Sequence, residues 1–229
     1  IQKGETILDL ACGEGFFSRR FVRLGANVLA SDIAPELIAI ARKHPESGGI
    51  KFDIAPADKI PFVKDSSIDK AAVVLAIQNI ENVKGVLAEL SRVLKPGGRV
   101  YLVLNHPVFR VPKESSWGFD PVKSQGDHGA SEGIQYRRID RYMSEARTKI
   151  DMHPGIRSFA GAQDDKQLTL SFHRPLQFYF KLLGKAGFGV TNMEEWVSEK
   201  ESEKGPRQEA ENRARKEIPL FMVLEATKT

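Results

Sequence analysis

The sequence has one cysteine in 229 residues, and this scarcity limits how the fold can be stabilised. Cys12 has no second cysteine with which to pair, so no disulfide can form within the chain. Free thiols are typical of reducing compartments, and we therefore expect a cytoplasmic protein. We expect Cys12 to act as a small residue in a turn, with a redox or nucleophilic role as the alternative.

Long apolar runs, a strong net charge and metal-ligand clusters are also missing. No apolar run reaches the roughly 18 residues that a membrane span needs. The 34 basic and 30 acidic residues leave a formal charge of +4, which is weak support for nucleic acid as a partner. His106, His128, His153 and His173 lack the compact spacing of a zinc site, so we expect no metal. A chain of this length, with 41% hydrophobic residues, suits one α/β domain or such a domain with an insertion.

The stretch Ile7–Gly15 (ILDLACGEG) predicts a strand that runs directly into a glycine-containing turn. Phe17, Phe21 and Leu24 then follow at helical spacing. A strand, a tight turn and a helix place backbone N–H groups and a helix N-terminus at the end of a buried strand. The stretch is therefore a candidate site for a nucleotide-like ligand.

Strands and helices alternate after this turn, which indicates a parallel sheet. Residues 71–77 form a continuous apolar run, as expected of a strand that is covered on both faces. Residues 199–217 are almost wholly polar or charged and are expected to form a solvated helix or a loop. Further strands are expected at residues 27–31, 50–55, 100–104, 188–196 and 220–226, and helices at 35–44, 82–94 and 175–186.

The glycine turn departs from the dinucleotide fingerprint G-x-G-x-x-G, because Ala11 stands at its first small position and Ser18 at its last. Asp9 would repel a pyrophosphate, but it suits a ligand that carries an ammonium group. With this acidic residue, Ile7–Gly15 resembles motif I of the class I S-adenosylmethionine (SAM)-dependent methyltransferases. The resemblance implies that Asp9 serves the methionine end of SAM, directly or through water; a turn without a ligand is the alternative. The cofactor residues that it implies in this turn are Asp9, Ala11, Cys12, Gly13, Glu14 and Gly15.

Asp32 and Ile33 directly follow the second expected strand and are predicted cofactor residues. An acidic residue at this place can accept two hydrogen bonds from ribose hydroxyls, as in other adenosine-binding sheets. Capping of the helix that begins near Pro35 is the alternative role for Asp32.

Two later stretches match the family in order and spacing. The resemblance implies that Ala57 and Asp58 lie against the adenine, unless they belong only to a polar loop. Ala76, Ile77 and Gln78 come at the carboxyl end of the central strand, in the crevice where ligands bind to open α/β sheets.

The run Leu94-Lys95-Pro96-Gly97-Gly98 before a strand also resembles this family, and the match covers residues 1–105 nearly without a break. The resemblance implies a Rossmann-like, doubly wound α/β sheet of seven strands, mostly parallel with one antiparallel strand at the edge. It implies a single domain, residues 1–229, with an insertion at residues 105–174 after the fifth strand. Members of the family have helical residues upstream of the first strand that help cover the cofactor, so we expect part of the site to lie before residue 1.

Residues 105–174 are rich in Pro, Gly, Ser and charged residues, and helical periodicity fades there. Such a long connection is usually functional or disordered, and its place after the fifth strand predicts a substrate lid. Within it, residues 135–151 and 167–172 are expected to pair as strands, with a loop at 151–166.

Two histidines at the borders of this lid are candidate catalytic residues, because histidine can act as a base near neutral pH. His106 follows the fifth strand directly and His173 precedes a helix. For both, a structural role at the end of an element is the alternative. Nearby cationic residues predict a small-molecule acceptor of anionic character, or else form a solvated strand face. These residues are Arg137, Arg138, Arg141, Arg147 and Lys149.

The leading hypothesis is methyl transfer from SAM to a small-molecule acceptor by in-line displacement, with S-adenosylhomocysteine (SAH) as product. The chain would align acceptor and methyl group and exclude water, and it would need a general base only if the acceptor loses a proton. The resemblance is to the small-molecule branch that includes quinone-biosynthesis C-methyltransferases, and it extends only over the cofactor half. The alternatives are a nicotinamide-dependent oxidoreductase on a Rossmann-type sheet, a non-enzymatic SAM-binding or interaction protein, and an enzyme that methylates RNA.

Overall fold

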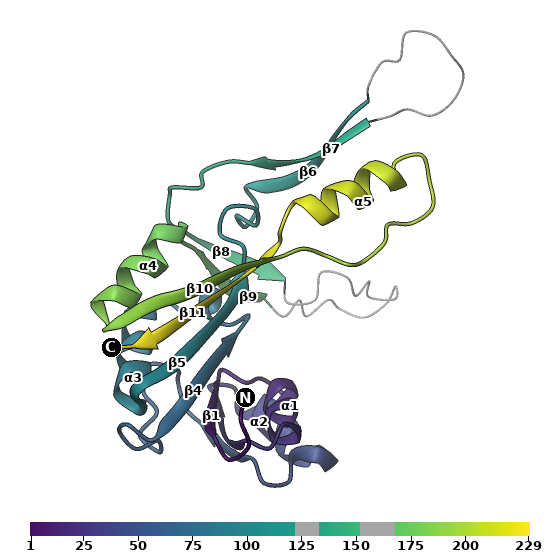
Figure 1. Cartoon of the computed structure of the whole chain (residues 1–229). Helices are drawn as coiled ribbons and strands as arrows, with labels where there is room; N and C mark the ends of the chain where they lie inside the picture. The colour runs from purple at the N-terminus through teal and green to yellow at the C-terminus, as the bar shows by residue number, and fades with distance from the viewer. Residues whose placement is uncertain (122–132, 152–167) are drawn as a thin grey trace.

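The computed structural model describes residues 1–121, 133–151 and 168–229. A seven-stranded sheet with the order β10-β11-β5-β4-β1-β2-β3 forms its centre (Figure 1). Its strands are β1 (Thr6–Leu10), β2 (Asn27–Asp32), β3 (Lys51–Ile54), β4 (Ile68–Val74), β5 (Leu94–Asn105), β10 (Phe188–Trp196) and β11 (Phe221–Lys228). The helices are α1 (Phe16–Arg23), α2 (Pro35–Lys43), α3 (Val83–Val93), α4 (Leu176–Lys185) and α5 (Gln208–Glu217), with short 3-10 turns η1 (Pro45–Ser47) and η2 (Ile77–Asn79).

The strand directions confirm the predicted sheet. Strand β1 pairs in parallel with β2 and β4, β2 with β3, and β4 with β5. Strand β11 is antiparallel to β5 on one side and to the edge strand β10 on the other. The carboxyl ends of β1 to β5 therefore meet at one edge of the sheet, which is where open α/β sheets bind ligands.

Helices cover both faces of the sheet because neighbouring residues of each strand point to opposite sides. In β1, Leu8 belongs to the large hydrophobic core with residues of α3 and α4, among them Leu90 and Leu183. Ile7 instead packs in a second core with Val28 and Phe21 of α1. These two layers confirm the doubly wound architecture. None of the helices among the described residues combines the length and apolar character needed to cross a membrane.

The segment between β5 and α4 contains two β-hairpins. Strand β6 (Ser115–Pro121) pairs with β7 (Gly133–Ile139), and β8 (Ala146–Asp151) pairs with β9 (Leu168–His173). The expected pairing is therefore right for β8 and β9 and wrong for residues 135–139, which pair with β6. The expected loop at 151–166 lies outside the described residues, apart from Asp151 at the end of β8.

Aromatic rings packed over glycines explain the pairing that the sequence did not reveal. A Cβ on Gly133 would collide with the Phe119 ring, and one on Gly118 would collide with the Tyr136 ring. Each ring lies over a glycine of the facing strand, an arrangement that stabilises hairpins that contain glycines. The β6–β7 hairpin extends away from the central sheet beside α5 (Figure 1).

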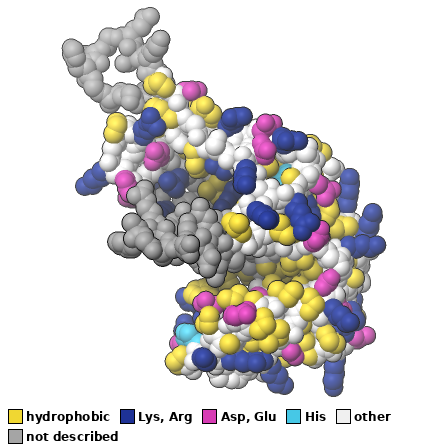
Figure 2. Space-filling model, turned by 180° about the vertical axis from the view of Figure 1, so that it is seen from behind, with side chains coloured by type: hydrophobic (Ala, Val, Ile, Leu, Met, Phe, Trp, Pro, Cys, Tyr) yellow, Lys and Arg dark blue, Asp and Glu magenta, His cyan; other side chains and the backbone are white. Residues whose placement is uncertain are grey.

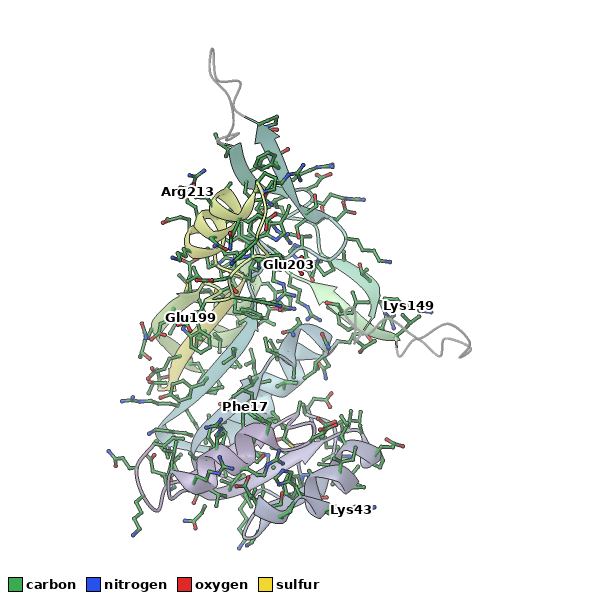
Figure 3. The ribbon with its side chains drawn as sticks, turned by 90° about the vertical axis from the view of Figure 1, so that its right-hand side faces the viewer. Phe17, Lys43, Lys149, Glu199, Glu203 and Arg213 are labelled. Carbon is green, nitrogen blue, oxygen red and sulfur yellow. The ribbon has the colours of Figure 1, made fainter. Side chains whose placement is uncertain are left out.

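The charged stretch at residues 199–217 includes the helix α5, in agreement with one of its two expected forms. Ala210 and Ala214 are the buried residues of this helix. Arg213 of α5 donates from Nη2 to the carbonyl of Gly133 at 3.0 Å, which attaches the helix to β7 (Figure 3). The small alanines thus allow a mainly charged helix to pack closely on a hairpin.

Candidate cofactor and acceptor site

The turn after β1 contains three residues in the left-handed region. Ala11, Gly13 and Gly15 have φ angles of 59°, 54° and 73°. Gly15 is the N-cap of α1, and a Cβ on it would lie 3.0 Å from the Phe52 ring of β3. The N–H of Cys12 donates to the Ser31 carbonyl of β2 at 2.9 Å. The turn therefore holds the ends of β1 and β2 and the start of α1 together.

Asp9 lies beneath this turn and is only 2% exposed. The Ser18 hydroxyl of α1 donates to its Oδ2 at 2.5 Å. Burial raises the pKa of Asp9 to about 6, and the bond from Ser18 offsets part of that rise. Because burial makes this carboxylate costly to ionise, a nearby cation would stabilise its charged form. Ser18, which seemed only a departure from the dinucleotide fingerprint, proves to be the partner of Asp9.

Asp32 connects the turn to the start of α2. Its Oδ2 accepts the Gly13 N–H at 2.8 Å, and its Oδ1 accepts the Ala34 N–H at 2.9 Å. The N-cap of α2 is Ala34, so Asp32 supports that N-terminus from two residues upstream. A carboxylate has about four lone-pair positions, and these two bonds leave roughly two for other donors. Both roles expected for Asp32, support of the helix start and ribose binding, are therefore compatible in one side chain.

Asp58 is held at the N-terminus of α3. Its Oδ2 accepts from Asn82 Nδ2 at 2.7 Å, while Asn82 Oδ1 caps the helix by accepting the Gly85 N–H at 3.0 Å. Asn82 thus bridges the loop after β3 to the helix after β4. The carboxylate of Asp58 has a fixed position next to the carboxyl edge of the sheet.

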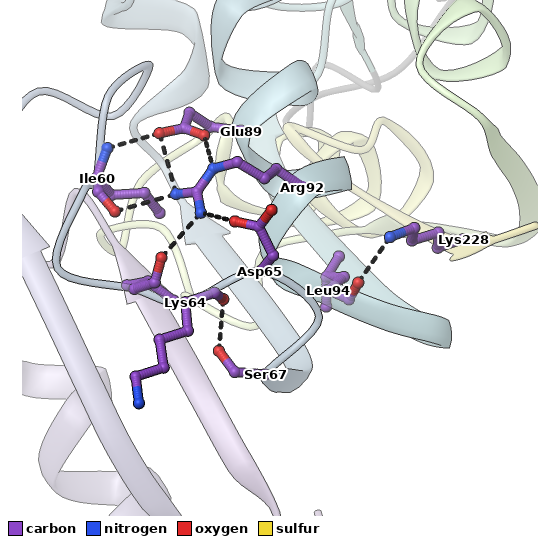
Figure 4. Close-up of polar contacts among 9 residues, drawn as sticks. Ile60, Lys64, Asp65, Ser67, Glu89, Arg92, Leu94 and Lys228 are labelled. Atoms are coloured by element: carbon purple, nitrogen blue, oxygen red, sulfur yellow. Dashed lines mark hydrogen bonds and ion pairs between the residues drawn. The ribbon is translucent and has the colours of Figure 1, made fainter.

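A network around Arg92 of α3 fixes the continuation of this loop (Figure 4). Arg92 donates to both carboxylate oxygens of Glu89, to Asp65 and to the carbonyls of Ile60 and Val63. Glu89 also accepts the Ile60 N–H at 2.8 Å. The bond from Arg92 lowers the pKa of Glu89, and the bonds to Glu89 and Asp65 raise that of Arg92, so Glu89 and Arg92 remain charged near neutral pH. The network lies apart from the candidate site and stabilises the loop that carries Asp58.

Two buried side-chain oxygens after β4 accept no hydrogen bond from the described residues. Gln78 Nε2 donates to the carbonyl of Leu75, a residue with φ of 53°, at 2.6 Å. Gln78 Oε1 and Asn79 Oδ1 are buried and have no partner among the described residues. Since buried polar atoms are nearly always paired, each of these oxygens is suited to accept from a ligand or from water.

The other predicted cofactor residues border the same edge of the sheet. Glu14 and Ile33 are exposed, Ala57 and Ala76 are half-buried, and Ile77 is buried. Burial, followed by the nearby Asp9, raises the pKa of the half-buried Cys12 thiol. Cys12 is thereby kept as a neutral thiol, which favours the expected packing role over a nucleophilic one.

His106 lies at the carboxyl end of β5 and is almost fully buried. Its Nδ1 accepts the Val108 N–H at 3.2 Å, so the proton is on Nε2, which lies 2.7 Å from Glu195 Oε1 of β10. Both ring nitrogens are therefore engaged. The contacts favour the structural alternative, in which His106 joins the start of the insertion to β10, and a catalytic role remains a prediction.

His173 ends β9 and is also buried. Its Nε2 lies 2.7 Å from the carbonyl oxygen of Tyr142 and so carries the donated proton. The Tyr142 hydroxyl accepts the Leu176 N–H at 3.0 Å. These bonds join β9, the segment before β8 and the start of α4, and they again favour the structural alternative while the catalytic role stays untested.

Arg174 is a buried residue that the sequence did not single out. Its Nη2 donates to the carbonyls of Ile80 and Glu81 at 3.0 and 2.9 Å, and its guanidinium stacks on Phe172 and Phe178. It therefore joins the end of the insertion to the loop after β4. The only local signal is an arginine before the proline that starts a helix, which is too common to be informative.

The cationic residues of the insertion do not form one cluster. Arg137 and Arg138 lie on β7, whereas Arg147 and Lys149 lie on β8 in the other hairpin. Arg147 packs over Phe172, 3.8 Å from Glu81. In Figure 3, Lys149 lies on the opposite side of the molecule from Arg213, and Figure 2 shows Lys and Arg side chains spread over the face that it presents.

A cavity of about 640 Å³ lies on the sheet face next to α1. Residues of β1, β4, β5, β10 and β11 line it, among them Val74, Val103 and Val223. Aromatic residues form much of its wall: Phe17 and Phe21 of α1, Tyr101, Trp196 and Phe221. The cavity reaches Leu75 at the end of β4 but includes none of the predicted cofactor residues. It therefore lies beside the candidate cofactor site, not within it.

Comparison with known proteins agrees with this geometry. Residues 8–102 match the family described as a methyltransferase domain. A crystal structure of an S-adenosylmethionine-dependent methyltransferase from Mesorhizobium loti matches with a TM-score of 0.71 and 26% identity, over 98% of this chain and 91% of that one. Residues 8–102 are a methyltransferase domain of the SAM-dependent class. The resemblance found in the sequence is thus confirmed.

Two curated proteins are similar in sequence to parts of this chain. The biotin biosynthesis bifunctional protein BioHC of Cellvibrio japonicus is 31% identical over 182 residues, which is 78% of this chain and 33% of that protein. A demethylmenaquinone methyltransferase of Tropheryma whipplei is 36% identical over 109 residues, 47% of this chain and 45% of that protein. The chain thus spans less than half the length of these two curated relatives.

Proposed function

We propose that the chain transfers a methyl group from SAM to a small-molecule acceptor by in-line displacement and releases SAH. The observation that carries this proposal is the group of carboxylates at one edge of the sheet. Asp9, Asp32 and Asp58 follow or end three successive strands, and the left-handed turn at Gly13 lies between the first two. A nicotinamide cofactor would instead bring a pyrophosphate, whose charge these carboxylates oppose.

The residues present fit SAM in the chemistry of their polar atoms. The ammonium group of the amino-acid end would be held near the buried Asp9, and the ribose hydroxyls would donate to the free positions of Asp32. The exocyclic amine of the adenine would donate to Asp58. The unpartnered oxygens of Gln78 and Asn79 would accept from the same ligand or from water next to it. When bound, SAM supplies an activated methyl group on a sulfonium, so the protein needs no covalent intermediate.

The chain's own contribution is to orient the acceptor and to exclude water. The insertion at residues 105–174 would form the acceptor side of the site, as a lid within the single domain. His106 and His173 would hold the borders of this lid, and either could take a proton only if its present hydrogen bond opened. The His106→Gln variant tests this. If His106 is the general base, the variant should lose turnover, whereas if His106 only positions the lid, the variant should retain most of it.

Calorimetry with SAH and with NAD tests the cofactor assignment. We expect SAH to bind and NAD to give no heat of binding. The reverse result would exclude a methyltransferase and support the oxidoreductase alternative.

Two glycine variants test whether the ligand passes over the turn. Gly13 and Gly49 both have positive φ, and a Cβ on either would meet no protein atom within 4 Å. Changing either to Ala should therefore cost a similar backbone strain of roughly 1–2 kcal/mol. Only Gly13→Ala should also weaken SAH binding, because its new methyl group would occupy the space of the ligand. Equal SAH affinities in the two variants would show that the ligand does not contact Gly13.

Incubation of the protein with labelled SAM and a metabolite extract tests turnover. A labelled small-molecule product supports the enzyme and identifies the acceptor. Binding of SAH without a product from any extract would favour the non-enzymatic SAM-binding alternative.

A further inference from the structure

Two arginines lie together where the insertion leaves the sheet. Arg110 belongs to the turn directly after β5, and its N–H donates to the His106 carbonyl at 2.9 Å. Its guanidinium stacks on the Phe221 ring at the start of β11, with 5.0 Å from Cζ to the ring centroid. Phe221 is also part of the wall of the apolar cavity beside the cofactor site. Arg110 therefore lies at the carboxyl edge of the sheet, next to a space large enough for a small molecule.

Arg137 of β7 is brought to the same place by the β6–β7 hairpin. Its Nε donates to the Phe109 carbonyl at 2.8 Å, and its Nη2 donates to the Ser115 hydroxyl at 2.8 Å. The guanidinium also stacks on Trp117, the residue opposite it in the hairpin. These contacts fix the orientation of Arg137 and leave Nη1 without a described partner.

The two cations have no carboxylate to balance them. Among residues 1–121, 133–151 and 168–229, no ion pair includes either arginine, and the guanidinium of Arg110 has no hydrogen-bond acceptor. Burial lowers the pKa of both, and the neighbouring charge of Arg110 lowers that of Arg137 further. The fold therefore holds two like charges together in a partly dry place, which is unfavourable unless an anion neutralises them.

Most of the other cations around the candidate site are engaged within the protein. Arg174 donates to two backbone carbonyls, and Arg147 lies near Glu81. Arg174 also has an Nη1 without a described partner, but its Nη2 is bound to two carbonyls, whereas the Arg110 guanidinium stacks on Phe221 and bonds no described acceptor. Guanidinium groups in such a pair match the oxygens of a carboxylate or a phosphate.

We propose that Arg110 and Arg137 bind an anionic group, a carboxylate or a phosphate, of the methyl acceptor. This inference rests on the proposed function and defines its substrate class: an acid whose less polar part lies toward the cavity at Phe221. The two arginines bind and orient the acceptor, and no bond is made or broken at them.

Binding of small probes to the full chain saturated with SAH tests the proposal. Benzoate and phenyl phosphate carry the two candidate anions, and benzamide is the neutral control of the same shape. By calorimetry we expect at least one anion to bind and benzamide to bind at least about tenfold more weakly, as for the loss of a charged hydrogen bond. Which anion binds more tightly separates carboxylate from phosphate. Equal affinities for benzamide and both anions would overturn the proposal.

Three variants locate the binding. Arg110→Gln and Arg137→Gln should each weaken anion binding by about tenfold or more. Arg138→Gln is the matched control, because Arg138 is the exposed neighbour of Arg137 on β7 and should leave binding unchanged. All three should keep the SAH affinity of the parent chain. Anion affinities unaffected by the first two changes, or reduced equally by the control, would refute the site.

Two further outcomes distinguish the anion site from a failure of the proposed function and from binding of nucleic acid. If the parent chain fails to bind SAH, the proposed function fails, and the anion titration repeated without SAH still decides whether the arginines bind an anion. A single-stranded RNA oligomer that binds in an Arg110-dependent way, while neither small anion binds, would replace the small acid by nucleic acid as the partner.

Discussion

The buried carboxylate of Asp9 leads to opposite predictions for stability and for cofactor binding. Its pKa in the folded chain is about 6, against an ordinary value of 3.8. Between these pH values the folded chain holds a proton that the unfolded chain has released, so the free energy of unfolding falls as the pH rises from about 4 to 6. A shift of about two pKa units corresponds to roughly 3 kcal/mol of unfolding free energy, which is lost by pH 7 in the absence of added ligand.

Binding of SAH should show the opposite dependence. Its ammonium group would interact with Asp9 only when the carboxylate is ionised, so the affinity should increase as the pH rises through 6. One proton is involved, and the change is therefore at most about tenfold per pH unit below pH 6. An ammonium held through one water would lie roughly 6 Å away, and an effective dielectric constant of about 20 gives roughly 3 kcal/mol for such a pair.

The Asp9→Asn variant separates the two effects. The amide oxygen can still accept from Ser18, so the change removes the charge with little change in shape. At pH 7 the variant should be more stable than the parent by up to about 3 kcal/mol in urea unfolding, because it has no buried charge. Its SAH affinity should be at least about tenfold lower and no longer depend on pH between 5 and 7.

The matched control is Asp53→Asn on β3, because within the described part of the chain the Asp53 carboxylate accepts only the N–H of Ile54. Asp53→Asn should alter neither the free energy of unfolding at pH 7 nor the affinity for SAH. The reasoning is refuted if the parent chain binds SAH equally at pH 5 and pH 7, or if Asp9→Asn keeps the pH dependence of the parent.

Five further substitutions have definite expected results. Ser18→Ala removes the hydrogen bond that lowers the pKa of Asp9, so the midpoint of the pH dependence of SAH binding should move above that of the parent; a midpoint that stays in place would remove Ser18 from the site. Asp32→Ala should weaken SAH binding by roughly 1.5–3 kcal/mol by calorimetry through the loss of charge-assisted hydrogen bonds, and an unchanged affinity would exclude ribose binding there. Arg174→Met leaves the carbonyls of residues 80 and 81 without their donor and should lower the free energy of unfolding by about 2 kcal/mol; no loss would mean that the contact is not needed. Leu90→Ala in the core should cost about 3 kcal/mol, whereas Leu24→Ala on the surface should stay within about 0.5 kcal/mol.

The parallel half of the fold could be predicted because its signals are local. An apolar run such as residues 71–77 identifies a buried strand, and the glycines after β1 identify the turn that follows it. The order of these elements along the chain then gives a parallel sheet. Small errors remained at the ends: β5 begins at Leu94, where the sequence suggested only a turn before a strand at residue 100.

The insertion could not be predicted as well because its pairing is non-local. The contacts of Phe119 with Gly133 and of Tyr136 with Gly118 join separate stretches of the chain, and nothing in the local pattern of either strand names its partner. For this reason residues 135–139 were expected to pair with the wrong segment.

The residues of the candidate cofactor site could be proposed from the sequence and remain a prediction, whereas the residues that support them could not be proposed. Asp9 and Asp32 stand out because an acidic residue at a strand end is uncommon without a purpose. Ser18 acts through a hydroxyl that reaches back from α1, and Arg174 acts through carbonyls almost a hundred positions away. Such contacts join residues that are distant in the sequence and are seen only in the folded structure. The same holds for the close approach of Arg110 and Arg137.

The hydrogen bonds from Arg174 to the loop after β4 affect how freely the insertion can change in sequence and length. The insertion starts at the end of β5, and its last residue is bound to the loop after the neighbouring strand β4. Both ends are therefore fixed at one place on the sheet, and the chain between them closes a loop. The entropy cost of such a loop grows slowly, by about 0.6 kcal/mol for each doubling of its length. Mutation can lengthen, shorten or replace the hairpins between these ends while the parallel half of the sheet stays intact. If the insertion forms the acceptor side of the site, as proposed, the acceptor can change at small cost to stability.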